Sequence, residues 1–229
     1  MGKQEPIFTR ETFRFFRDLA RNNKKVWMDA NRERYLQAVV QPFRRLLEAV
    51  SPDVLQLDAR LDTSARGGRN FSRINRDIRF AKDKTPYRPQ MYLKFLAPFP
   101  GEGETGELYT GLSAKTVTVG FRIYSGAKRK ESSLGVIADA RILAQPKWLT
   151  QQKTKLSRRY ESYWYSLEKK EWKEQSGWPA NPEDWKKLQA WIVRRKLKLS
   201  DATQATFPSE IAKIFRDLFP VLKFTSLPD

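Results

Sequence analysis

The chain has 229 residues, and its 44 lysines and arginines outnumber its 26 aspartates and glutamates, which gives a formal net charge of +18. It contains no cysteine and no histidine, so disulfides, thiolate nucleophiles, Cys- or His-ligated metals and imidazole-dependent triads are all excluded. The excess charge is +7 over residues 1–110 and +11 over residues 111–229. A body charged throughout, rather than a basic tail, predicts an anionic partner.

The composition otherwise fits a folded protein outside the membrane. Apolar residues make up 40% of the chain and aromatic residues 13%, more than a disordered chain would carry. No apolar run approaches the roughly 18 residues that span a bilayer, and the first residues lack the apolar segment of a secretory signal. We therefore expect a soluble, cytoplasmic protein with no membrane partner.

Helical patterns open and close the chain. Thr9 stands as an N-cap before apolar residues at helical spacing. In the next helical stripe, Pro42 predicts a kink and Ser51-Pro52 an end. A last amphipathic helix is expected to open at Thr206-Phe207-Pro208.

Between these helices, period-two and helical patterns alternate. Residues 91–96, 116–124 and 191–199 are expected as strands, and apolar and polar residues alternate most clearly in the second of them. Residues 133–145 and a stripe over 149–167 have helical spacing.

Together these elements predict an α+β class: one domain over residues 1–229, with a mostly antiparallel sheet packed by N- and C-terminal helices. A basic, tryptophan-rich elaboration is expected at about 146–180. No pattern in the sequence indicates an oligomeric state.

The least ordinary stretch is residues 69–88, where seven cations surround only Asp77 and Asp83. Because guanidinium and ammonium groups bind phosphate and carboxylate, six of these cations are predicted ligand-binding residues: Arg73, Arg76, Arg79, Lys82, Lys84 and Arg88. Read as a strand, the run places Arg76 among apolar neighbours, where it needs a carboxylate partner. Two alternatives are a structural ion-pair network, with Asp77 as its orienting carboxylate and Tyr87 packed on a turn, and a plain solvated face.

The same run resembles a family signature. Residues 73–87, together with Trp27, Tyr35 and the segment 207–224, resemble a widespread, mostly bacterial family called domain of unknown function 2461. The resemblance implies one α+β domain and a site around the following residues: Arg76, Asp77, Arg79, Lys82, Asp83, Lys84 and Tyr87. Pro89-Gln90 departs from the family pattern, which often has a histidine there.

A second basic stretch contains most of the tryptophans. Six of the seven lie between Trp148 and Trp191, interleaved with lysines and arginines. Aromatic rings beside cations can stack on unpaired bases. The same spacing suits core packing under lysine and arginine stems, which is the alternative interpretation.

Three short patterns resemble cofactor, catalytic or metal sites, but none is complete, so we expect no cofactor and no metal. Residues 101–106 spell G-x-G-x-x-G without the strand and helix that a dinucleotide site needs. Residues 125–128 spell S-x-x-K without its usual companion motifs. Asp77 and Asp83 are carboxylates that suit Mg²⁺, but the surrounding cations would compete with a metal.

Three functions remain open from the sequence. The first is binding of an anionic, phosphate-bearing ligand, with nucleic acid as one candidate. The second is an enzyme acting on a phosphorylated or other anionic substrate, with Asp77 or Tyr87 as the candidate catalytic residue that handles protons. The third is a scaffold or partner-binding protein with Trp172 and Trp178 as exposed anchors.

Overall fold

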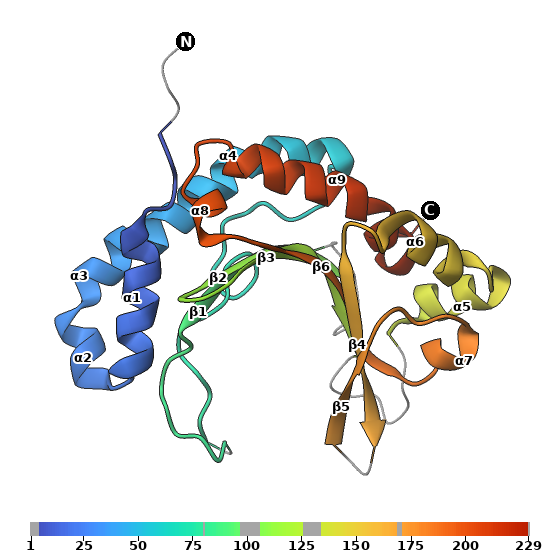
Figure 1. The fold of residues 1–229 in the computed structure, drawn as a ribbon, viewed down its shortest axis with the longest axis horizontal. Helices are drawn as coiled ribbons and strands as arrows, with labels where there is room; N and C mark the ends of the chain where they lie inside the picture. Colours follow the sequence, from blue (N-terminus) through green and yellow to red (C-terminus); the bar gives the residue numbers. More distant parts are fainter. Residues whose placement is uncertain (1–4, 80, 97–105, 126–133, 169–170, 229) are drawn as a thin grey trace.

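One antiparallel sheet forms the centre of the fold. The computed structural model describes residues 5–79, 81–96, 106–125, 134–168 and 171–228. Within them, six strands pair in the spatial order β1-β2-β3-β6-β4-β5 (Figure 1). The strands are β1 (Gln90–Leu96), β2 (Glu107–Ser113), β3 (Val117–Tyr124), β4 (Glu161–Glu168), β5 (Glu171–Ser176) and β6 (Leu188–Leu197). The predicted α+β class and its antiparallel sheet are confirmed.

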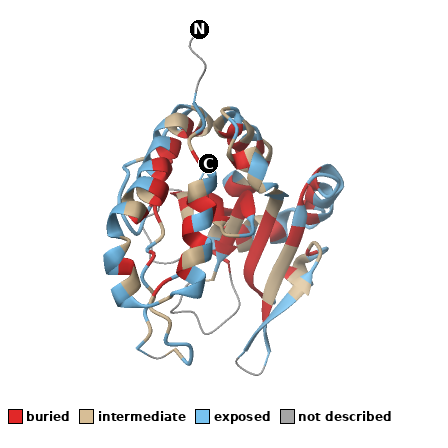
Figure 2. Cartoon of the chain, turned by 60° about the vertical axis from the view of Figure 1, so that its left-hand side comes forward, coloured by how far each residue is buried: buried red, intermediate tan, exposed pale blue. Residues whose placement is uncertain are grey.

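Two long helices, α4 (Gln41–Leu57) and α9 (Phe207–Ser226), cover one face of this sheet. Apolar side chains of alternate strand residues meet them, and the rings of Phe95 and Phe215 lie 5.7 Å apart edge to face. Figure 2 shows buried residues along the inner sides of the helices and along the strands. The other helical elements are α1 (Arg10–Arg21), α2 (Lys25–Ala30), α3 (Arg32–Tyr35), the π-helix η1 (Leu36–Val40), α5 (Val136–Ala144), α6 (Trp148–Leu156), α7 (Pro182–Trp185) and α8 (Leu199–Ala202).

The N-terminal helices are joined at a π-helical turn. The Thr9 cap is confirmed, since its hydroxyl accepts a hydrogen bond from the Glu11 amide at 3.2 Å. η1 ends two residues before Pro42, which has no amide hydrogen for the carbonyl of Ala38 four residues earlier. The hydroxyl of Thr12 donates to that carbonyl at 2.7 Å. Thr12 on α1 therefore satisfies the Ala38 carbonyl that Pro42 leaves without a helical hydrogen bond.

Two expected helix boundaries are wrong. α4 continues through Pro52 to Leu57, so Ser51-Pro52 does not end it. The helical stripe expected over 149–167 is helical only in α6, and β4 begins at Glu161. In β4, tyrosines and serines alternate on opposite faces, and this period of two outweighs the helical spacing of its aromatic residues.

The expected strands at 91–96 and 116–124 are confirmed as β1 and β3. The helix expected over 133–145 is confirmed as α5, and the helix expected to open at 206–208 is confirmed as α9. The strand expected at 191–199 is β6, which starts earlier, at Leu188, and ends at Leu197, since Leu199 already belongs to α8.

The tryptophan-rich stretch supplies core. Trp191 is fully buried, and Trp148, Trp178 and Trp185 pack edge to face on it at 6.3, 6.1 and 5.9 Å between centroids. Trp172 is 48% exposed. Core packing is therefore the better interpretation for four of these rings, and of the two expected anchors only Trp172 stands at the surface.

No described helix is both long and apolar enough to cross a membrane. The described residues also contain no group of three or more carboxylates that could hold a metal ion. The G-x-G-x-x-G match and the S-x-x-K match lie outside the described residues, except for Gly106 and Ser125.

Candidate anion-binding surface

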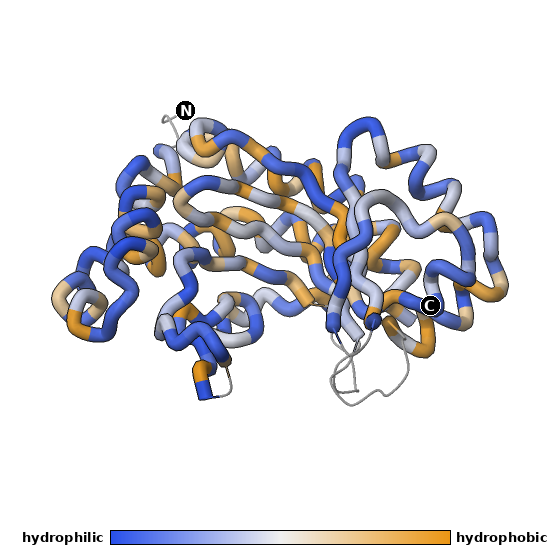
Figure 3. The backbone as a smooth tube through the Cα atoms, turned by 60° about the horizontal axis from the view of Figure 1, so that its bottom comes forward, coloured by the Kyte–Doolittle hydropathy of each residue, from blue (hydrophilic) through white to orange (hydrophobic). Residues whose placement is uncertain are grey.

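The face of the sheet turned away from α4 and α9 carries tyrosines and arginines. Figure 1 shows the β4–β5 hairpin and the segment before β1 on this side, and Figure 3 turns it toward the reader, with a hydrophilic hairpin. Strand pairing places Tyr92 opposite Gly111, and Glu107 opposite Arg122. We call this surface the tyrosine–arginine face, and it consists of Tyr92, Tyr109, Arg122, Tyr124, Tyr163, Tyr165, Trp172 and Arg194.

Arg122 is the centre of this face. Its guanidinium carbon lies 4.6 Å from the ring centroid of Tyr92, 4.5 Å from that of Tyr109 and 5.8 Å from that of Tyr124. These are cation–π distances. Its Nε donates to the carboxylate of Glu107. Burial acts to lower the pKa of Arg122, but the Glu107 carboxylate and the tyrosines outweigh it and raise that pKa.

Arg122 and Lys94 share one carboxylate. Lys94 Nζ lies 3.6 Å from the second oxygen of Glu107, and the three side chains are only 17, 14 and 10% exposed for Lys94, Arg122 and Glu107. The group therefore holds one surplus positive charge in a largely desolvated place. Electrostatic interactions are stronger there than in bulk water.

A second group of the same composition lies across the sheet on β4 and β6. Arg194 donates to Glu161, and Lys196 Nζ lies 3.2 Å from the other oxygen of that carboxylate. Arg194 also stacks on the Tyr163 ring at 4.6 Å and donates to its hydroxyl at 2.9 Å. Burial raises the pKa of Tyr163 to about 12, although Arg194 opposes the shift.

Exposed aromatic rings continue the face onto the hairpin. Tyr124 and Trp172 stack with an interplanar angle of 22° and a centroid separation of 6.4 Å, and they are 38 and 48% exposed. Tyr165 packs on Trp172 at 5.9 Å and donates to the carboxylate of Glu174 at 2.7 Å. A planar group could therefore stack beside Arg122.

Two glycines make room for this arrangement. A Cβ on Gly111 would stand 2.3 Å from the Tyr92 ring. A Cβ on Gly120 would stand 2.3 Å from the carbonyl oxygen of Val193 and 2.7 Å from the Cβ of Arg194. Tyr92 and Arg194 can thus occupy their positions because Gly111 and Gly120 have no Cβ.

The predicted site at residues 69–88 is an irregular segment, with only isolated bridges such as Asn75–Tyr87, so the strand interpretation is wrong. Arg76 does find the partner that it needs: it donates to Asp83 and to Thr85, whose carbonyl lies at 3.2 Å. The Thr85 amide, and after it Arg76, lowers the pKa of Asp83 to about 2.

Other charged groups of this segment also have local partners. The carboxylate of Asp77 binds the guanidinium of Arg79 at 2.7 Å, and Arg79 lowers the pKa of Asp77. Lys84 Nζ donates to the Ile78 carbonyl at 3.0 Å, and Arg88 donates to the Arg73 carbonyl at 3.1 Å. These contacts fold the segment on itself, as the structural alternative expects.

Tyr87 is buried, and the Asn23 side chain pairs with its backbone amide and carbonyl at 3.0 and 2.8 Å. Arg73 and Lys82 are exposed. The structure thus separates the predicted residues: a turn holds some of them, and others point to solvent.

A pocket of about 430 Å³ lies beside the segment 69–88. Of the six predicted cations, only Arg76 and Arg88 line it within the described part of the chain, and Asn23 and Gln90 lie on its wall. The Asp83 carboxylate, which pairs with Arg76, also lines it. The Tyr92 hydroxyl donates to Gln90 Oε1 at 3.3 Å. The pocket therefore adjoins the tyrosine–arginine face at the start of β1.

No sequence motif marks the tyrosine–arginine face. Arg122 lies in a predicted strand, but its partners on the neighbouring strands come from β1 and β2, and they meet only through the sheet register. The one signal in the sequence is an arginine on the polar side of the clearest alternating strand.

Comparison with family models gives a match over residues 11–224 to the family described as conserved hypothetical protein (DUF2461). The match includes both the pocket and the tyrosine–arginine face. No curated protein matches the chain.

Proposed function

Because the chain belongs to the DUF2461 family, whose description names no activity, we propose its function from its surface: it binds a phosphate-bearing anionic ligand on the tyrosine–arginine face. The observation that carries this proposal is the pair of groups in which two cations share one carboxylate: Lys94 and Arg122 around Glu107, and Arg194 and Lys196 around Glu161. A phosphate would supply the missing negative charge.

The surroundings favour phosphate with a planar group attached. Guanidinium groups bind phosphate through two parallel hydrogen bonds, and bases stack on exposed aromatic rings. Arg122 lies directly beside the exposed pair Tyr124 and Trp172. A nucleotide unit, free or within single-stranded nucleic acid, satisfies both requirements.

The family run contributes a second contact in this proposal. Arg76 and Arg88 line the adjoining pocket, where they would hold a further phosphate, and the exposed Arg73 and Lys82 would add positive potential around it. Asp77 is bound to Arg79, so no observation places a proton-handling group at this ligand. Binding is the function that the geometry supports best.

The test is the affinity for a fluorescein-labelled oligothymidylate and for thymidine monophosphate, measured by anisotropy and calorimetry. We expect Tyr124→Ala and Trp172→Ala each to weaken oligothymidylate binding about 5- to 150-fold, since one stacked base is worth about 1–3 kcal/mol. Val26→Ala removes an apolar side chain that is more exposed still, 81% on α2, and should leave the affinity unchanged. Equal affinities in all four proteins would contradict the proposal.

A further inference from the structure

One face of α1 is a stripe of arginines. Arg10, Arg14, Arg17 and Arg21 recur at i, i+4, i+7 and i+11, and all four are exposed. At 3.6 residues per turn they fall within an arc of about 60°, and successive guanidinium groups stand about one turn apart along roughly 16 Å of helix. The opposite side of α1 packs Phe15, Phe16 and Leu19 into the core.

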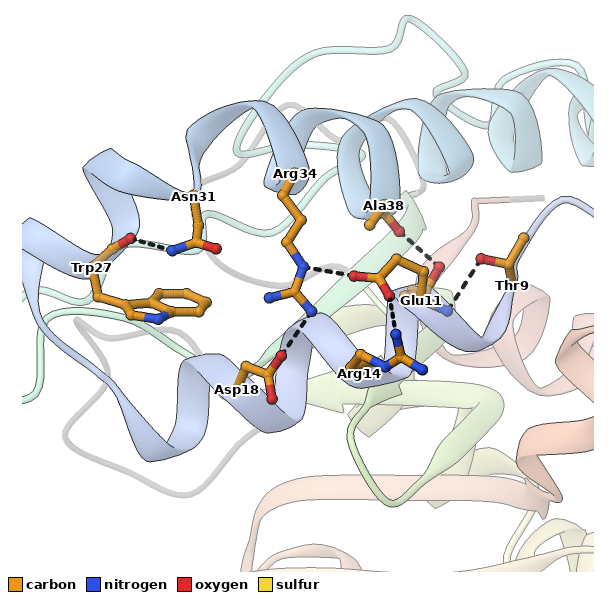
Figure 4. A network of polar contacts seen from close by, with 9 residues as sticks. Thr9, Glu11, Arg14, Asp18, Trp27, Asn31, Arg34 and Ala38 are labelled. Atoms are coloured by element: carbon orange, nitrogen blue, oxygen red, sulfur yellow. Dashed lines mark hydrogen bonds and ion pairs between the residues drawn. The ribbon is translucent and has the colours of Figure 1, made fainter.

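The acidic residues of α1 do not neutralise this stripe. Figure 4 shows Glu11 and Asp18 turned toward α3, where Arg34 binds them at 2.6 and 2.7 Å. Glu11 also reaches Arg14 at 3.4 Å. Among the described residues, no carboxylate lies within ion-pair distance of Arg10, Arg17 or Arg21.

The stripe also lines a pocket. A space of about 430 Å³ lies between α1 and α8: Arg10, Arg14 and Arg17 line one side, and Ser200, Thr203 and Gln204 line the other. Phe13 and Leu199 supply apolar surface between them. The guanidinium groups are donors of the kind that contact phosphate oxygens. Opposite them, the Thr203 hydroxyl and the Gln204 amide donate to the Ser200 carbonyl at 2.9 and 3.3 Å.

From this arrangement we propose that the α1 stripe and its pocket bind the sugar–phosphate backbone of a nucleic acid. Cations that repeat every turn suit a repeating anion better than a single phosphate. Besides these arginines α1 exposes Ala20, and Phe13 in the pocket is 4% exposed. The helix therefore presents no exposed apolar anchor of the kind that a membrane surface or a protein interface core would need. The proposal does not depend on the tyrosine–arginine face.

The experiment compares two variants with the same loss of charge. Arg10→Gln, Arg14→Gln and Arg17→Gln together neutralise the stripe. Lys153→Gln, Lys155→Gln and Arg158→Gln together remove three exposed cations on and just after α6, at the other end of the molecule. Binding of a labelled 20-nucleotide oligothymidylate and of a 20-base-pair duplex is measured between about 50 and 200 mM salt, because phosphate contacts weaken strongly over this range.

For the stripe variant we expect an affinity loss of at least about tenfold for one or both probes, and a fall of about 2 in the slope of log K against log salt, since each phosphate contact contributes roughly 0.7–0.9. The α6 variant should change both quantities by less than about half as much. The probe that responds more identifies the single-stranded or the duplex form.

Equal losses in the two variants, no loss in the stripe variant, or no binding by the unaltered protein at 50 mM salt would each overturn the proposal. Arg10→Gln with Arg17→Gln, which leaves the Arg14–Glu11 contact intact, provides a second variant, and an unchanged melting temperature verifies its fold. The Tyr124→Ala and Trp172→Ala variants keep the stripe intact, so failure of the stacking test does not affect this one.

Discussion

Glu107 is the residue that holds two buried cations together. Replacing it with Gln leaves Arg122 and Lys94 buried without a carboxylate, and breaking a buried pair from one side costs about 3–5 kcal/mol. We expect Glu107→Gln to lower the free energy of unfolding by about that amount in urea titrations. The control is Glu168→Gln, which breaks a 2.7 Å pair with Lys173 whose side chains are 47 and 54% exposed, and it should cost about 0–1 kcal/mol. Similar losses in both variants would contradict the assigned role of Glu107.

Tyr163 makes the face sensitive to alkaline pH. Its pKa is raised to about 12 in the fold by burial, against about 10 in an unfolded chain. The folded state therefore keeps this proton more tightly, so its contribution to stability is complete below about pH 10 and is lost as pH rises toward 12. We expect the unfolding free energy to fall across this window, and to fall less steeply in Tyr163→Phe.

Absorbance at 295 nm, which follows tyrosinate, provides the direct measurement. The difference between the unaltered protein and Tyr163→Phe should titrate near pH 12 while the fold persists. A midpoint near 10 would show that the Tyr163 hydroxyl is solvated and that Arg194 does not bind it in a buried setting.

At the scale of elements, the two glycines of β2 and β3 determine how closely the strands and side chains approach. A Cβ on Gly120 would meet backbone atoms of β6, which cannot move without displacing the strand. We expect Gly120→Ala to destabilise the protein by about 1–3 kcal/mol, as overpacking does.

Gly111→Ala would meet the Tyr92 ring, which can move, so we expect a smaller loss of stability but weaker ligand binding, because Tyr92 leaves Arg122. The control is Gly67→Ala, where nothing lies within 4 Å of the new Cβ. Thermal melts and oligothymidylate affinities of the three variants would verify the order, and a neutral Gly120→Ala would contradict it.

The sequence predicted those elements whose periodicity is unambiguous. The alternation over 116–124 gave β3, and the apolar spacing after Phe207 gave α9. β4 was missed because Tyr160, Tyr163 and Leu167 also fit a helical period. Only pairing with β6 and β5 shows which period applies. α4 passes through Pro52 because its buried face, including Val50 and Val54, continues on both sides of the proline.

The candidate site was predictable only where it is local in sequence. Arg76 and Asp83 are seven residues apart, and their expected pairing is present. Arg122 and Tyr92 are thirty residues apart and meet through two strand registers, which no short motif encodes. Cations that cluster in the sequence, such as Lys84 and Arg88, hold their own turn together. The groups in which two cations share one carboxylate lie on strands that contain no cluster of charges in the sequence.

At the scale of the whole molecule, the net charge of +18 divides into surfaces with different surroundings. The tyrosine–arginine face combines surplus charge with aromatic rings, the pocket beside it contains Arg76 and Arg88, and α1 presents arginines alone. We propose a phosphate with a base for the first surface and a phosphate backbone for the last.

The most direct test of the central claim removes the surplus charge without breaking the buried pairs. Lys94→Gln with Lys196→Gln leaves Arg122 bound to Glu107 and Arg194 bound to Glu161. Lys153→Gln with Lys155→Gln on α6 is the matched control. The measurement is the slope of log K against log salt for oligothymidylate binding. We predict that the slope falls by about 1.4 in the first variant, or roughly 0.7 for each phosphate contact on a single strand, and stays nearly constant in the control. A slope unchanged by the first variant, or changed equally by both, would contradict phosphate binding on the tyrosine–arginine face.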